Sequence, residues 1–144
     1  MGARTGGREA ALKMLFGIEA TQVDAETAIA LYWREFGGDV ETRPYADESV
    51  RGVVGERDQL DQTIGTASEH WRIERMTRVD RNVLRLGTWE LRHRRDVPTE
   101  VILDEAVELA KRYGSEESGA FVNGVLNQIA GTERRTEEGS GEGS

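Results

Sequence analysis

Apolar residues recur at helical spacing through most of this 144-residue chain, and this periodicity constrains the fold more than any other feature. In the segment FVNGVLNQIA, residues 121–130, two signals conflict. The apolar spacing predicts a helix, whereas Asn-Gly between apolar residues is typical of a β-hairpin. On a helix, one arc collects all of its large apolar side chains: Phe121, Val122, Val125, Leu126 and Ile129. A strand would mix them with Asn123 and Gly124. We therefore predict a helix in which Gly124 lets another helix approach, at a cost of about 1 kcal/mol relative to alanine.

The same spacing predicts helices along the rest of the chain, over residues 6–20, 24–36, 47–70, 76–94 and 98–113. Asp24 and Ser115 are the expected N-caps of the second and the last helix. Pro98 is the expected first residue of the helix that Gly114 stops. The segment GGDVETRPY between the second and third helices is rich in turn-forming residues and should be a loop.

The composition, with 37% apolar and 32% charged residues, is typical of a well-solvated globular protein. We expect an all-α fold, a compact bundle of about six to seven short helices. It should form one domain over residues 1–130, followed by a disordered acidic tail over residues 131–144. No apolar run approaches the roughly 20 residues of a membrane span, and we expect no secretory leader. Without cysteines, disulfides and thiol chemistry are excluded, and a cytoplasmic location is expected.

Charge is unevenly distributed along the chain. The net charge is −8, yet residues 71–95 carry eight arginines and three acidic residues. This asymmetry permits a local anion site on an acidic protein, and arginine suits bidentate phosphate contacts. Four of these arginines share one helix face opposite the apolar one: Arg78, Arg81, Arg85 and Arg92. Two interpretations stay open for them, a solvated face or a contact surface for RNA phosphate or an acidic protein patch.

The sequence offers little for catalysis. There is no cysteine nucleophile, and His70 and His93 lie outside any recognisable motif. The HExxH, Walker A and GxGxxG patterns are missing, so we expect neither an enzyme nor a bound metal or cofactor. Glu90 falls on the apolar face of its predicted helix, where an ionised carboxylate needs partners. We expect it at the edge of the core, bonded to a neighbouring arginine or a helix end.

Three stretches, in this order, resemble the NusB family of transcription antitermination factors: REAALKMLF, WRIERMTRVDRNVLRLGTWEL and VPTEVILDEAVELAKRYGSEESGAFVNGVLNQIA. The resemblance implies an all-helical protein without catalytic activity. It implies binding of the boxA element of ribosomal RNA leader transcripts together with NusE, a small-subunit ribosomal protein. The pair would join an antitermination complex on RNA polymerase that reads through terminators.

The resemblance also implies where partners bind. Its RNA surface corresponds to Arg4, Arg8, Phe16, Glu117, Ser118 and Phe121, and its NusE-facing surface to Asp80 and Arg81. Periodicity alone places Phe16 and Phe121 on apolar faces and favours core packing for both, with stacking on a base as the alternative.

Two departures from the family bear on function. The N-terminal segment has two arginines among three glycines where family members often carry a dense arginine run, and Gly119-Ala120 follow Ser118. The alternative function is therefore a helical protein-interaction module or homodimer with weak or masked RNA binding.

Overall fold

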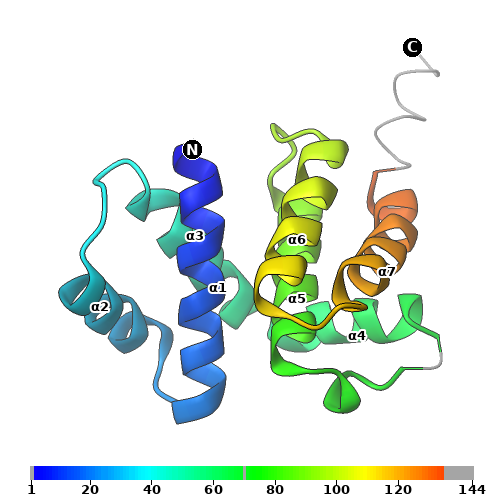
Figure 1. Cartoon of the computed structure of the whole chain (residues 1–144), viewed down its shortest axis with the longest axis horizontal. Coiled ribbons are helices and arrows are strands. Elements are labelled where there is room, and N and C mark those ends of the chain that lie inside the picture. The colour runs from blue at the N-terminus through cyan, green and yellow to red at the C-terminus, as the bar shows by residue number, and fades with distance from the viewer. Residues whose placement is uncertain (1, 70, 135–144) are drawn as a thin grey trace. The chain divides into compact units, whose positions relative to one another are not determined.

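The computed structural model describes residues 2–69 and 71–134, and all regular structure in these ranges is helical (Figure 1). The elements are α1 (Ala3–Thr21), α2 (Ala25–Phe36), α3 (Arg43–Gly55), α4 (Arg57–Ala67), the 3₁₀ turn η1 (Ile73–Arg75), α5 (Arg78–His93), α6 (Thr99–Tyr113) and α7 (Ser118–Glu133). The expected all-α fold is confirmed. The helix predicted over residues 47–70 is in fact two, because the chain breaks at Glu56 between α3 and α4.

Helix ends follow the capping chemistry at two of the four predicted positions. The Asp24 carboxylate accepts a 2.7 Å hydrogen bond from the Thr27 N–H and caps α2 as predicted. Gly114 directly follows α6 and ends it. The prediction for Ser115 is wrong, because α7 begins only at Ser118. Pro98 precedes the first residue of α6 instead of being that residue.

The chain divides into two compact units, one running to Arg57 and the other starting at Asp58. In the first unit, α1 packs against α2 and α3, which also contact each other. Its buried apolar side chains include Leu12, Leu15, Ile29, Val50 and Val53. The single domain over residues 1–130 stays a prediction.

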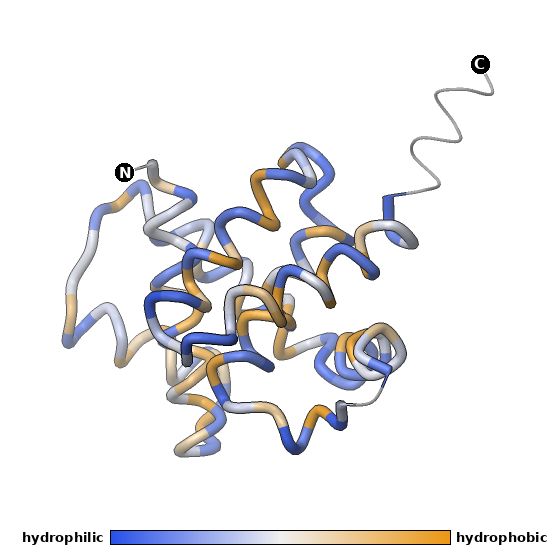
Figure 2. Tube along the Cα trace, turned by 45° about the vertical axis from the view of Figure 1, so that its right-hand side comes forward, coloured by the Kyte–Doolittle hydropathy of each residue, from blue (hydrophilic) through white to orange (hydrophobic). Residues whose placement is uncertain are grey.

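Helix α5 packs against both α6 and α7 in the second unit, and α6 packs against α7 (Figure 1). Every residue from Asn82 to Leu91 is buried. Hydrophobic and hydrophilic residues alternate along the helices, as Figure 2 shows, so apolar stripes rather than apolar segments build the core. Glu90 is 2% exposed, which places it inside the core rather than at the edge that we predicted.

The close approach of two helices occurs at a glycine other than the predicted one. Gly124 is exposed, and a Cβ added there would meet no atom within 4 Å, so the packing role predicted for it is wrong. A Cβ at Gly87 in α5 would instead lie 2.9 Å from Cδ1 of Leu126 in α7. Gly87 is thus the residue that lets these two helices pack closely.

Helix α7 continues beyond the predicted start of the tail. Arg134, which follows it, is 8% exposed, and its guanidinium donates to the carbonyls of Leu91 (3.0 Å), Val97 (3.2 Å) and Arg94 (3.3 Å). The predicted tail is therefore wrong for residues 131–134. His70 and residues 135–144 lie outside the described residues. None of the described helices has the length and apolar character that a bilayer crossing requires.

Candidate nucleic-acid interface

The α4–α5 connection, the start of α5 and the segment from Ser115 to Phe121 line a pocket of about 390 Å³. Three residues predicted from the family resemblance meet in it: Asp80, Glu117 and Phe121. Trp71 and Thr77 also line this pocket. The second unit thus brings together residues that the resemblance assigned to RNA and to a protein partner.

Asp80 is the least satisfied polar group of this pocket. Its backbone N–H bonds to the Thr77 hydroxyl at 3.1 Å, which caps α5. The side chain is buried, at 8% exposure, and its Oδ1 has no hydrogen-bond partner among the described residues. A buried carboxylate oxygen without a donor is costly, so the pocket is suited to a ligand that supplies one.

Phe121 forms a wall of the pocket instead of a core contact. Its side chain is half-buried, and its ring meets the ring of Trp71 edge-on, with centroids 5.8 Å apart and planes at 65°. The core packing favoured for Phe121 is therefore wrong, and part of its ring stays accessible to a ligand.

Ser118 and Arg81 form hydrogen bonds with the backbone next to the site. Ser118 is 1% exposed, and its hydroxyl accepts the Ser115 N–H at 2.9 Å. A Cβ at Gly114 would lie 2.5 Å from that hydroxyl, so glycine is needed there. The Arg81 guanidinium donates to the Met76 carbonyl just before α5. Ser118 is thus inside the fold, whereas Glu117 beside it is exposed.

The two N-terminal arginines differ in exposure within the first unit. The guanidinium carbon of Arg4 lies 5.5 Å from the centroid of the Tyr45 ring, and that of Arg8 lies 5.3 Å from it. Arg4 is exposed, but Arg8 is only 3% exposed. Arg8 is therefore buried against Tyr45 and has a structural role, whereas the positive charge of Arg4 is accessible at the surface.

Phe16 in α1 is 40% exposed, so the prediction that favoured core packing is wrong for this residue. Its helix buries Leu12 and Leu15 and leaves the Phe16 ring partly accessible. The alternative, stacking on a base, stays a prediction.

Two of the four arginines on the α5 face are engaged inside the second unit. Arg85 is 5% exposed and forms a two-pronged ion pair with Asp61, at 2.7 and 3.0 Å. Arg92 donates to Glu133 and, at 2.9 Å, to the Thr63 hydroxyl. The solvated-face interpretation is wrong for both, and a phosphate would have to displace their carboxylate partners.

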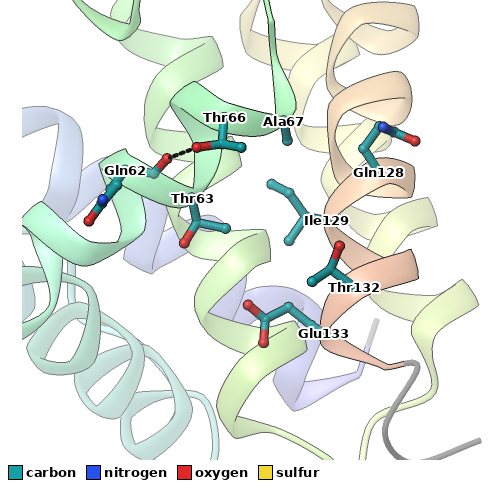
Figure 3. A pocket seen from close by; sticks show the side chains of 8 residues that line it. All are labelled: Gln62, Thr63, Thr66, Ala67, Gln128, Ile129, Thr132 and Glu133. Atoms are coloured by element: carbon teal, nitrogen blue, oxygen red, sulfur yellow. Dashed lines mark hydrogen bonds between the residues drawn. The ribbon is translucent and has the colours of Figure 1, made fainter. Parts of the chain in front are cut away.

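A second groove, of about 410 Å³, lies between α4 and α7 (Figure 3). Its wall is largely amide and hydroxyl side chains, from Gln62, Thr63, Thr66, Gln128 and Thr132. It contains none of the residues predicted to bind RNA or protein. Across residues 2–69 and 71–134, no group of three or more His, Asp or Glu side chains could hold a metal ion.

Sequence reasoning missed two residues of these surfaces. Tyr45, under the N-terminal arginines, is buried at 7% exposure, and the helical pattern carries no signal for it. Trp71 opens the arginine-rich stretch, and an aromatic residue directly before arginines is a signal by which it could have been found.

Comparison with known proteins assigns the chain to a family. The model of the NusB family matches residues 5–131. The transcription antitermination protein NusB of Sorangium cellulosum (strain So ce56) is 65% identical over 130 residues, which cover 90% of this chain and 93% of that protein. The transcription antitermination protein NusB of Myxococcus xanthus (strain DK1622) is 46% identical over 134 residues, which cover 90% of this chain and 96% of that protein.

Solved structures show the same fold. T. maritima NusB is 41% identical, with a TM-score of 0.82 and coverage of 88% of this chain and 89% of that one. A chain in the crystal structure of antitermination factors NusB and NusE in complex with dsRNA is 28% identical. Its TM-score is 0.84, with 92% of this chain and 98% of that one covered. This chain therefore belongs to the NusB family.

Proposed function

We propose that this chain is a cytoplasmic transcription antitermination factor that binds boxA-type RNA of ribosomal RNA leader transcripts together with NusE. It supports read-through by RNA polymerase as part of an antitermination complex. The observation that carries the proposal is the family match over residues 5–131. The role is one of binding and positioning, so no catalytic step is assigned.

Side chains that are at least partly accessible are assigned to RNA. Arg4, held over the Tyr45 ring, contacts phosphate, and Phe16 and Phe121 stack on bases. Glu117 accepts hydrogen bonds from base amino groups, because a carboxylate repels phosphate.

Two buried residues act through their neighbours. Arg8 donates toward the Tyr45 hydroxyl at 3.5 Å and supports the ring beneath Arg4. Ser118 fixes the loop that presents Glu117. Both are positioning residues rather than RNA contacts.

Asp80 and Arg81 are assigned to the protein partner. The Asp80 Oδ1 lacks a donor, and an ammonium or guanidinium of NusE would supply one. Arg81 keeps the turn before α5 in place through the Met76 carbonyl. Because Asp80 and Phe121 line one pocket, NusE and RNA should adjoin there and strengthen each other's binding.

The test is fluorescence anisotropy of a labelled boxA-type RNA, with and without NusE, at two salt concentrations. Binding should tighten with NusE and weaken steeply with salt. Arg4→Ala should reduce the slope of log K against log salt by about 1, while Arg34→Ala, an exposed arginine of α2, should not. Asp80→Asn should diminish the gain from NusE and leave binding by the chain alone unchanged.

Competition and mass measurements separate the alternatives. Unlabelled single strand should compete better than a duplex of the same sequence, because stacking needs accessible bases. A folded sample that binds no RNA under any of these conditions contradicts the proposal. A stable dimer in light scattering, unaffected by RNA or NusE, would then favour the protein-interaction module.

A further inference from the structure

The connection between α4 and α5 exposes a tryptophan that core packing does not explain. Trp71 is 54% exposed, and its ring meets the ring of Phe121 edge-on. It lines the 390 Å³ pocket together with Phe121 and extends into a neighbouring groove of about 790 Å³. The ring thus bridges the proposed RNA site and a second concave surface.

Two hydrogen bonds fix the backbone that carries this exposed ring. The hydroxyl of Ser68, a residue that is 8% exposed, donates to the Trp71 carbonyl at 2.9 Å, and the Trp71 N–H donates to the Ser68 carbonyl at 3.3 Å. Glu69 lies at φ 53°, a left-handed conformation that is unfavourable for a residue with a Cβ. Strain of this kind is typical of binding sites, where a side chain must be presented in one orientation.

The charged side chains that line the groove favour binding of an uncharged base over binding of a phosphate. Asp58, Glu69 and Glu74 line it and repel anions, so an uncharged ring suits the groove itself. Arg72 and Arg75 also line it, and both are exposed. Within the described part of the chain, neither guanidinium has a hydrogen bond or ion pair, in contrast to the arginines paired on α5.

We propose that Trp71 is a second base-stacking residue for single-stranded RNA, beside Phe121, and that Arg72 and Arg75 hold the phosphates flanking the stacked base. The inference rests on the proposed function and extends its RNA site onto the α4–α5 connection. Because the two ring planes meet at 65°, Trp71 and Phe121 stack on different bases. Stacking on tryptophan tolerates any base, so Trp71 adds affinity rather than sequence preference.

The experiment measures RNA affinity of the full chain by anisotropy. Trp71→Ala should weaken binding about 5- to 150-fold, the effect of removing one stacked base. Trp71→Phe should retain most of the affinity. Phe36→Ala, which removes a 67% exposed aromatic from α2, is the matched control and should bind as wild type. Far-UV circular dichroism verifies that all variants fold.

An abasic scan of the RNA locates the contact. When one base at a time is removed, one position should lower the RNA affinity of wild type but not that of Trp71→Ala. A different position should lower the affinity of wild type but not that of Phe121→Ala. As a second readout, RNA should quench tryptophan emission of wild type, and Trp71→Phe should lose that quenching while Trp33 and Trp89 remain.

Two outcomes overturn the inference alone. One is wild-type RNA affinity in Trp71→Ala. The other is loss of NusE binding by Trp71→Ala with RNA binding by the isolated chain intact, which would assign the ring to the protein partner. If wild type itself binds no RNA, the proposed function fails as well, so the two failures are distinguishable.

Discussion

Alanine at Gly87 and alanine at Gly124 should change the free energy of unfolding in opposite directions, although both glycines lie within helices. Each substitution gains about 1 kcal/mol of helix propensity. At Gly124 the new methyl group meets no atom within 4 Å, so the full gain of about 1 kcal/mol should appear. The Asn-Gly pair in α7 is then replaceable without a structural penalty.

At Gly87 the same methyl group collides with the core. Its Cβ would lie 2.9 Å from Cδ1 and 3.1 Å from Cδ2 of Leu126, a residue with 0% exposure. Overpacking of this kind costs about 1–3 kcal/mol. Subtracting the propensity gain leaves a net loss of about 0–2 kcal/mol. The two variants should therefore differ by about 1–3 kcal/mol in unfolding free energy.

Urea unfolding followed by far-UV circular dichroism measures both variants, with equal m-values as the condition for comparing midpoints. The double variant Gly87→Ala/Leu126→Ala should be more stable than the sum of its single changes, because the shortened side chain makes room for the methyl group. If Gly87→Ala stabilises the protein as much as Gly124→Ala, the close approach of α5 and α7 is not as tight as argued.

Three further variants address buried polar groups and a cap. Arg85→Gln should lower the unfolding free energy by about 1.5–3 kcal/mol, because it removes the ion pair with the partly exposed Asp61 carboxylate, while RNA affinity of the folded protein stays unchanged. Arg134→Ala should cost about 1.5–3 kcal/mol by the same assay, and an unchanged midpoint would show that its three carbonyl contacts contribute nothing. The hydrogen bond from Thr27 lowers the pKa of Asp24, so this cap stabilises fully above the unfolded-state pKa and is lost as pH falls through the lowered folded-state value. The Tm of wild type should therefore fall more steeply on acidification than that of Asp24→Asn, and parallel curves would contradict the coupling.

Local patterns were sufficient for most helices and insufficient for the site. In α7 the spacing of apolar residues predicted the structure better than the Asn-Gly hairpin signal. A helix there buries an apolar stripe several turns long, and this packing stabilises it more than a local preference for a turn destabilises it. The same spacing missed the break at Glu56, where α3 and α4 are consecutive helices with similar periodicity. A solvated face was one interpretation of the arginines on α5. The sequence could not exclude it for Arg85, because no local pattern shows that Asp61 of α4 pairs with this residue.

The sequence by itself determined the all-α class, the cap at Asp24 and, through ordered motifs, membership of the NusB family. These follow from interactions within a few residues or from linear resemblance. Only the tertiary structure decided which glycine separates two helices, which arginines are already paired, and that Trp71 meets Phe121 beside an unsatisfied Asp80. Each of those depends on atoms that the chain brings together from distant positions, and accessibility is a property of that assembly rather than of any local pattern.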